Sequence, residues 1–488
     1  MTRNSIASNR RVDYRLVIAL AALIGVGYFL AVSAFVYKIG FPLDDAWIHL
    51  VYARNFAEYG EWAFRLGEHS AGSTSPLWTA LLAIGYLIRL APYAWTYILG
   101  WLALSAIAIL AESTARRLIR TYQPRVPWVG LFIALEWHLT WSATSGMEIL
   151  LHGLIVMAVL TALMERSRRY LTLGLLAGLS VWVRPDGLTL LGPILFTMIL
   201  QEDSLASRGR AFVKIAIGFG ALFVPYLAFN LALSGTPMPN TFYAKQAEYE
   251  VYWLSKSLTE RLTEYVLPIV ASPFVILIPG LFLWIYKSVR EKNWGAVAGL
   301  IWFFGYIGIY FMRLPAYQHG RYIIPALPIL YLWGLLGMVG FMTLPSTNKR
   351  ISFFWQVMTV VLIFSFQIVG AYQNAYDVIW IESQMVRTAQ WVNENLPPET
   401  VLAVHDIGAI GYFSENPLID LAGLITPEVV PFIRDETRLA AYIDSTPAEY
   451  MISFPSLYPQ LTSRHTSAFE AGLEEFPFNE NMNVYLWK

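Results

Sequence analysis

The chain has 488 residues, of which 56% are apolar and only 14% are Asp, Glu, Lys or Arg. Soluble globular domains carry about 25% charged residues, and here 34 basic residues are balanced by 34 acidic ones. This composition excludes a disordered chain, a nucleic-acid-binding protein with a basic surface, and a soluble cytosolic enzyme. The absence of cysteine excludes disulfides, thiolate metal sites and cysteine nucleophiles. The main solvent is therefore predicted to be the lipid bilayer.

A membrane-spanning helix takes about 20 apolar residues, and eleven segments approach or exceed that length. The first is too long for the apolar region of a cleavable signal peptide, so it is predicted to be a transmembrane helix. The eleven predicted crossings are Leu16–Tyr37, Pro76–Leu110, Pro127–Trp141, Ile149–Met164, Tyr170–Val183, Leu188–Leu200, Phe212–Leu233, Tyr265–Tyr286, Trp294–Met312, Tyr322–Met342 and Phe353–Tyr372.

Two of these regions are irregular. The run 76–110 is too long for one straight crossing and is interrupted by Arg89-Leu90-Ala91-Pro92, so one half is expected to lie flat or re-enter. The segments 170–183 and 188–200 are each only about 20 Å long at 1.5 Å per residue. The intervening Arg184-Pro185-Asp186-Gly187 is therefore expected at membrane depth, beside protein or a wet cavity.

Basic residues gather in alternate loops, which the positive-inside rule places in the cytoplasm. A multi-pass protein of the cell (inner) membrane with a cytoplasmic N-terminus follows. These residues are Arg3, Arg10, Arg11, Arg15, Arg116, Arg117, Arg120, Arg125, Arg166, Arg168, Arg169, Arg208, Arg210, Lys214, Lys287, Arg290, Lys292, Lys349 and Arg350. The outward segments are then Lys38–Ser75, Ser142–Glu148, Ser234–Glu264, Arg313–Arg321 and the tail.

Charge divides the chain into two predicted domains. Residues 1–373 carry a net charge of +11 and residues 374–488 a net charge of −11. The first is an all-α polytopic membrane domain with outer loop 38–75. The second is a small extracytoplasmic α/β domain, with a helix over 378–395, strands at 401–404, 417–420, 450–453 and 483–487, a Gly-rich loop at 406–411, and helices near 427–433 and 438–444.

Asp44 and Asp45 follow the first crossing and open an apolar helix. They are suited to cap that helix, but paired carboxylates at the edge of a buried helix also indicate a base, a cation site or a partner. His49 lies one turn from Asp45 on the same face, where it is either a packed histidine or a partner for a metal or proton. Asp44, Asp45 and His49 are thus the candidate metal ligands, and a divalent cation is neither required nor excluded.

Other outward helix ends carry cations and acids. Arg54 lies in the first outer loop, Arg184 and Asp186 flank Pro185, and Tyr243 and Lys245 lie near the membrane surface. His319 and Arg321 open the penultimate crossing, and Glu148 starts another helix. For several of these residues a purely structural role is the alternative to a functional one. It is helix capping for Glu148, mutual pairing for Arg184 and Asp186, and snorkelling for Lys245 and Arg321.

Together the acids of the first outer loop and these cations predict one cavity. It would hold a phosphate whose lipid tail lies in the bilayer, while an outer carboxylate takes a proton from an incoming hydroxyl. Arg and Lys side chains would stabilise the departing phosphate.

Several motifs in order carry a family resemblance. They are Asp44-Asp45, Tyr52-Ala-Arg-Asn55, Gly67-Glu68, Gly72-Ser-Thr-Ser-Pro-Leu-Trp78, Ser145-Gly-Met-Glu148, Val183-Arg-Pro-Asp186, Pro239-Asn-Thr-Phe-Tyr-Ala-Lys245, His319-Gly-Arg321 and Leu418-Ile-Asp-Leu-Ala-Gly-Leu-Ile-Thr-Pro427. The sequence resembles the polytopic GT-C glycosyltransferases, and looks most like the cell-wall arabinofuranosyltransferases that use decaprenyl-phospho-arabinose.

The resemblance implies transfer of a sugar from a polyprenyl-monophosphate carrier to a glycan, lipid or protein on the outer face, with Asp44 or Asp45 as base. It implies that Arg184, Lys245, His319 and Arg321 surround the donor, and Arg54, Asp186 and Tyr243 are added as donor-site candidates. The tail is shorter than expected for the carbohydrate-binding β-sandwich of several arabinosyltransferases. A lipid-linked glycan polymerase or ligase, a transporter or flippase, and a non-catalytic scaffold remain the alternatives.

Overall fold

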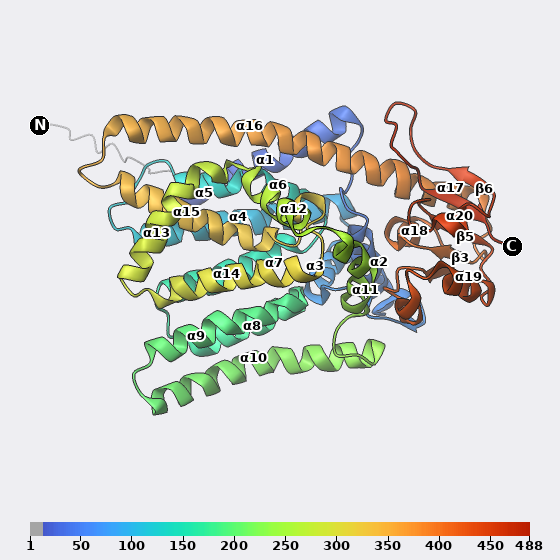
Figure 1. Cartoon of the computed structure of the whole chain (residues 1–488), viewed down its shortest axis with the longest axis horizontal. Coiled ribbons are helices and arrows are strands. Elements are labelled where there is room, and N and C mark those ends of the chain that lie inside the picture. The colour runs from blue at the N-terminus through green and yellow to red at the C-terminus, as the bar shows by residue number, and fades with distance from the viewer. Residues whose placement is uncertain (1–12) are drawn as a thin grey trace, which may run out of the picture.

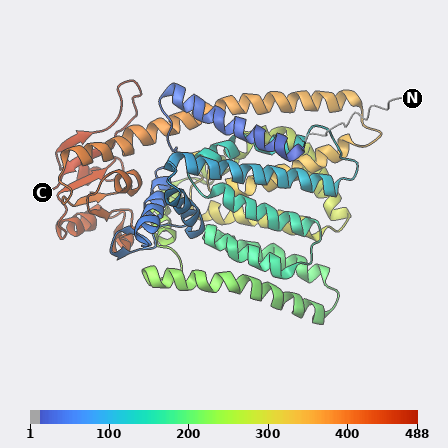
Figure 2. The same cartoon turned by 180° about the vertical axis from the view of Figure 1, so that it is seen from behind.

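The computed structural model describes residues 13–488, which form a layered bundle of helices with a small mixed β-sheet at one end (Figure 1). The view from behind shows the same arrangement, with the sheet and its helices beyond the ends of the long helices (Figure 2). Arg3, Arg10 and Arg11, from which a cytoplasmic N-terminus was partly predicted, lie outside the described residues.

Most of the chain is helical, as the apolar segments predict. The bundle contains α1 (Tyr14–Val36), α3 (Pro76–Leu87), α4 (Pro92–Leu118), α5 (Trp128–Ala134), α6 (Trp137–Thr144), α7 (Ile149–Met164), α8 (Tyr170–Val183), η1 (Pro185–Leu190), α9 (Leu191–Gln201), α10 (Leu205–Ser234), η2 (Pro273–Leu277), α13 (Ile278–Arg290), α14 (Trp294–Arg313), η3 (Gln318–Gly320), η4 (Ile324–Ala326), α15 (Leu327–Met342) and α16 (Lys349–Ile381). Within residues 13–488, seven helical stretches are long and apolar enough to cross a membrane, and three shorter apolar helices accompany them. The count of eleven crossings stays a prediction.

Three predicted crossings are divided. The run 76–110 forms α3 and α4, because the chain turns at Arg89, whose φ is 57°, and α3 packs on α2 (Asp45–Tyr59). The run 127–141 breaks at Glu136, whose buried carboxylate accepts the Leu139 N–H at the start of α6. The run 265–286 breaks after α12 (Leu258–Val270), where Ser272 caps η2.

The predicted cytoplasmic loops gather at one end of the bundle. Arg117 pairs with Glu165 at 2.7 Å, and Arg166 donates to the Glu291 carbonyl at 3.2 Å. A further contact joins the hydroxyls of Thr121 and Thr343 at 3.0 Å. This end lies opposite the sheet in Figure 1, so the basic loops share one side and the tail lies on the other.

The outer loop and the tail lie at the same end of the molecule (Figure 1). There α2, the short strands β1 (Ala63–Arg65) and β2 (Glu68–His69), and α11 (Asn240–Ser255) meet the tail. Helix α16 continues through the π-helix η5 (Glu382–Val386) into α17 (Arg387–Asn395) and so connects the bundle directly to the sheet.

The tail folds around five strands in the order β4-β3-β5-β7-β6. Strand β3 (Leu402–Val404) is parallel to β4 (Leu418–Asp420) and β5 (Tyr450–Ser453), whereas β7 (Asn483–Leu486) is antiparallel to β5 and β6 (Ser467–Glu470). The remaining helices are α18 (Ile407–Phe413), η6 (Pro427–Phe432), α19 (Glu436–Asp444) and α20 (Pro459–Thr462). The prediction of a Gly-rich loop at 406–411 is wrong, because residues 407–411 form most of α18.

Glycines allow α13 and α15 to approach closely. A Cβ added at Gly337 would lie 1.8 Å from the Gly280 carbonyl oxygen, and one added at Gly280 would lie 2.1 Å from that of Gly334. Small residues of this kind permit the backbone contact on which helix association in membranes relies.

We therefore expect Gly337→Leu to force α13 and α15 apart and to destabilise the protein by about 1–3 kcal/mol or more. The thermal unfolding midpoint in detergent measures this. Gly27→Leu is the matched control, because a Cβ at Gly27 meets no atom within 4 Å. Equal midpoints for the two variants would contradict the prediction.

Candidate functional site

Asp45 lies in an ion-pair cluster that joins three separate segments. Its Oδ2 is 2.7 Å from Lys245 Nζ on α11 and 3.1 Å from Arg321 Nη1, just after η3. Although burial alone raises it, the charges of Lys245 and Arg321 hold the pKa of Asp45 well below its usual range. Three of the predicted site residues are thus brought together, and Lys245 and Arg321 do not simply snorkel.

A second cluster centres on Arg184, at the break between α8 and η1. Its guanidinium contacts Glu148 Oε1 at 2.9 Å, Asp186 Oδ1 at 3.3 Å and the Tyr310 hydroxyl at 2.9 Å. Asp186 also accepts hydrogen bonds from Tyr306 at 2.8 Å and Tyr310 at 2.6 Å. Arg184 and Asp186 pair with each other, but they do so within a larger network. Glu148 makes no capping hydrogen bond to its helix.

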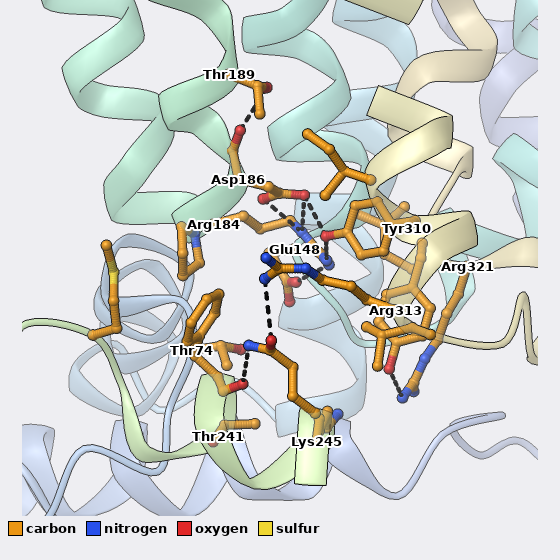
Figure 3. A pocket seen from close by; sticks show the side chains of 18 of the residues that line it. Thr74, Glu148, Arg184, Asp186, Thr189, Thr241, Lys245, Tyr310, Arg313 and Arg321 are labelled. Carbon is orange, nitrogen blue, oxygen red and sulfur yellow. Dashed lines mark hydrogen bonds and ion pairs between the residues drawn. The ribbon is translucent and has the colours of Figure 1, made fainter. Parts of the chain in front are cut away.

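Both clusters line one cavity of about 280 Å³, which we call the main cavity. Figure 3 shows side chains reaching it from η1, α11 and α14. Its charged lining residues are Asp45, Glu148, Arg184, Asp186, Lys245, Arg313 and Arg321.

Arg313 lines the main cavity, although the sequence predicts it only as the first residue of an outer segment. It ends α14, and its Nη1 donates to Gln246 Oε1 at 3.1 Å. In the described residues it has no carboxylate within ion-pair distance, unlike Arg184, Lys245 and Arg321. A basic residue at a helix end beside the predicted outer segment 313–321 was the available signal.

An apolar groove adjoins the main cavity. It has a volume of about 470 Å³ between η1, α9 and α14, and it shares Leu188, Thr189 and Ile309 with the main cavity. Phe196, Ile301 and Ile309 in this groove are partly exposed. The charged main cavity therefore adjoins an apolar groove that is partly exposed at the surface of the bundle.

Asp44 points away from the main cavity and binds the tail. Its two carboxylate oxygens accept the backbone N–H groups of Gly408 at 2.9 Å and Ala409 at 2.8 Å, at the start of α18. It makes no capping bond to its own helix α2. Burial and the nearby carboxylate of Asp406 raise the pKa of Asp44 to about 7.

His49 is buried, and both of its ring nitrogens lie close to polar side chains. Its Nδ1 lies 3.1 Å from both Ser73 Oγ and Thr79 Oγ1, and its Nε2 lies 3.5 Å from Glu148 Oε2. Ser73 in the turn before α3 and Thr79 within α3 thus contact His49, and Ser75 makes no side-chain capping bond to α3. Within residues 13–488, no group of three or more His, Asp or Glu side chains is arranged to hold a metal ion.

Three predicted donor-site residues, His319, Arg54 and Tyr243, lie outside the lining of the main cavity. His319 contacts Asp377 at 2.8 Å between the rings of Trp137 and Trp141. Arg54 donates a hydrogen bond to the Tyr412 carbonyl at 3.0 Å, and its guanidinium stacks on the Tyr412 ring. Both contacts tie Arg54 to α18.

Tyr243 is partly exposed, and it does not line the main cavity although its neighbour Phe242 does. The motifs identified the correct loops for these residues but not the side of the helix or turn on which each side chain lies.

A family model and several solved structures are similar to this chain. Residues 373–485 match a family model described as a domain of unknown function (DUF8728). No curated protein matches the sequence. Among solved structures, ArnT from Cupriavidus metallidurans bound to undecaprenyl phosphate is similar at 14% identity and a TM-score of 0.60, over 97% of this chain and 98% of that one.

Two further solved structures are similar. The Archaeoglobus fulgidus oligosaccharyltransferase has 11% identity and a TM-score of 0.61, over 96% of this chain and 76% of that one. The mycobacterial arabinofuranosyltransferase AftD has 14% identity and a TM-score of 0.56, over 97% of this chain and 40% of that one. The chain therefore shares its fold with these three solved structures, as the resemblance to GT-C glycosyltransferases predicted.

The pKa of Asp44 predicts a pH dependence of stability. An unfolded Asp titrates at about 3.9, so between about pH 4 and 7 only the folded protein keeps this proton. The resulting stabilisation is complete below about pH 4 and is lost as the pH rises through the folded value of about 7.

Asp44→Asn removes this titrating group. We expect the unfolding midpoint of the wild type to fall relative to that of Asp44→Asn from pH 5 to 8, as measured by differential scanning fluorimetry. Asp203→Asn, at an exposed position in the loop before α10, should keep the wild-type slope. A wild-type slope in Asp44→Asn would contradict the assignment.

Proposed function

We propose that this protein is an integral-membrane glycosyltransferase that moves a sugar from a polyprenyl-monophosphate carrier to an extracytoplasmic acceptor. The observation that supports this most is the position of Arg184, Lys245, Arg313 and Arg321 around one cavity that adjoins an apolar groove. Cations suit the phosphate, and the groove suits an isoprenoid chain. The solved ArnT structure contains undecaprenyl phosphate.

The proposed orientation places the tail on the extracytoplasmic side of the membrane. The basic loops lie at the opposite end of the bundle, and short basic loops remain in the cytoplasm. The donor would therefore bind with its phosphate at the outer surface. This supports a lipid-linked sugar as donor, because a nucleotide sugar would have to be bound on the cytoplasmic side.

The reaction would exchange one C–O bond for another. An acceptor hydroxyl oxygen attacks the anomeric carbon, the bond from that carbon to the phosphate oxygen breaks, and polyprenyl phosphate leaves with the bonding electron pair. The hydroxyl proton passes to a carboxylate. The cations stabilise the charge that develops on the leaving phosphate.

Asp45 is the carboxylate best placed for this role, because it lines the main cavity while Asp44 binds α18. In the structure it is paired with Lys245 and Arg321, which makes it a poor base. A donor phosphate would compete for the same two cations. Binding of the donor would release Asp45 from Lys245 and Arg321 and would raise the pKa of Asp45. The base would therefore become effective only when the donor is present.

The central test measures transfer from synthetic lipid-linked donors by the purified protein in nanodiscs. Decaprenyl-phospho-arabinose and undecaprenyl-phospho-hexoses are supplied with cell-envelope glycan as acceptor. Asp45→Asn should lower the transfer rate roughly 10²–10⁴-fold, as loss of a general base does, and Asp203→Asn should not. Wild-type rates in Asp45→Asn would overturn the base assignment.

Absence of transfer from every donor would instead favour a polymerase or ligase with a diphosphate carrier, or a flippase. Transport of fluorescent polyprenyl phosphate across liposomes separates these two cases.

Arg313 gives a test of the phosphate site that does not depend on the sugar. Because its guanidinium has no acidic partner among residues 13–488, it can pair with the donor phosphate, and a hydrogen bond to a charged group contributes about 1.5–3 kcal/mol. Arg313→Gln should therefore weaken binding of undecaprenyl phosphate roughly tenfold or more, as measured by native mass spectrometry. Arg290→Gln, at the opposite end of the bundle, is the matched control, and equal affinities would contradict the prediction.

A further inference from the structure

A second, polar cavity lies between the outer loop and the tail. Its volume is about 120 Å³, and its lining combines bundle and tail residues, among them Asp45, Glu248, Arg321, His405 and Asp406. We call it the tail cavity. The motifs of the sequence analysis did not include Glu248, His405 or Asp406.

His405 is held in this cavity by two carboxylates from different parts of the chain. Its Nε2 lies 3.3 Å from Glu248 Oε1 on α11, and its Nδ1 lies 3.3 Å from Asp406 Oδ2. Although burial alone lowers it, nearby Tyr458 and Asp406 and the carboxylate of Glu248 raise the pKa of His405 well above its usual range. The two carboxylates therefore favour the cationic form of the imidazole.

One buried donor in the lining has no hydrogen-bond acceptor among residues 13–488, and a second has only an ion-pair contact. Arg321 is 8% exposed, and its Nε has no partner, whereas His405 is 7% exposed, and the 3.3 Å contact of its Nε2 with Glu248 lacks hydrogen-bond geometry. Buried donors without an acceptor are costly, and both side chains line the tail cavity. They indicate a ligand with oxygen acceptors.

The two cavities share a common wall. Asp45, Lys245 and Arg321 line both of them. A donor in the main cavity would reach this cluster from the bundle side, and a ligand in the tail cavity would reach it from the tail side. Asp45 thus lies between the two positions that a transfer reaction must bring together.

We propose that the tail cavity binds the acceptor, and that the acceptor is a hydroxyl-rich, carbohydrate-type molecule. This inference rests on the proposed function. Carboxylates of Asp45, Glu248 and Asp406 accept from hydroxyls, while Arg321 and His405 donate to them, and each hydroxyl both donates and accepts. The same carboxylates disfavour an anionic group. The tail would then complete the active site.

The test uses saturation-transfer-difference NMR on the full-length protein in nanodiscs. The probes are methyl β-D-glucoside, methyl β-D-galactoside, methyl α-D-mannoside and methyl α-D-arabinofuranoside. The wild type should bind at least one of them. Glu248→Gln should weaken that binding roughly tenfold, and Gln318→Ala, an exposed lining position chosen to preserve folding, should also weaken it.

Glu428→Gln, an exposed tail residue outside the cavity, is the matched control and should bind as the wild type does. Undecaprenyl phosphate binding is measured on the same samples and should be unchanged in all three variants. If no glycoside binds the wild type, or if Glu248→Gln and Gln318→Ala bind like Glu428→Gln, the acceptor assignment is overturned while the donor site stands. If the wild type fails to bind undecaprenyl phosphate, the proposed function fails and this inference with it.

Discussion

The ion-pair cluster of Asp45, Lys245 and Arg321 is the constraint on which the outer half of the molecule depends. Partly buried charges are costly unless each has a partner, so the first residue of α2 must remain beside α11 and the turn after η3. Lys245 lies 200 residues after Asp45 in the chain, and Arg321 lies further along still. The same pairing that fixes their positions also places a carboxylate between two cations suited to phosphate, so structural and chemical requirements coincide at one point.

The tail is attached to this cluster by a different kind of interaction. Asp44 accepts two N–H groups of α18 while Arg54 stacks on Tyr412 of the same helix. Two successive aspartates therefore have different tasks, one toward the bundle and one toward the tail. A single peptide unit joins the aspartate that binds the tail to Asp45, which lines both cavities.

Sequence patterns predicted the fold class because long apolar runs and alternating loop charge depend on the bilayer and not on tertiary contacts. They also identified Arg184, Asp186, Lys245 and Arg321, because a charge beside a Pro or at a helix end in an apolar context needs a partner. Helix breaks were harder to predict. The break at Glu136 depends on a buried capping carboxylate, and the one after Arg89 depends on a left-handed backbone conformation.

Residues with distant partners escaped prediction or were misplaced. His405 meets Glu248 across more than 150 residues, and no spacing rule connects them. His319 and Arg54 belong to plausible motifs, but their side chains turn to Asp377 and Tyr412. Arg313 could have been noticed as a helix-end cation, yet its lack of an acidic partner becomes visible only when every neighbouring carboxylate has been placed.

Helix α16 has a mechanical consequence. Its 33 residues span about 50 Å at 1.5 Å per residue, whereas the hydrocarbon core of a bilayer is about 30 Å thick. The excess length, prolonged by η5 and α17, holds the β-sheet beyond the end of the bundle. The distance between the sheet and the apolar part of the bundle is thus set by the rise of one continuous helical segment and not by a flexible linker.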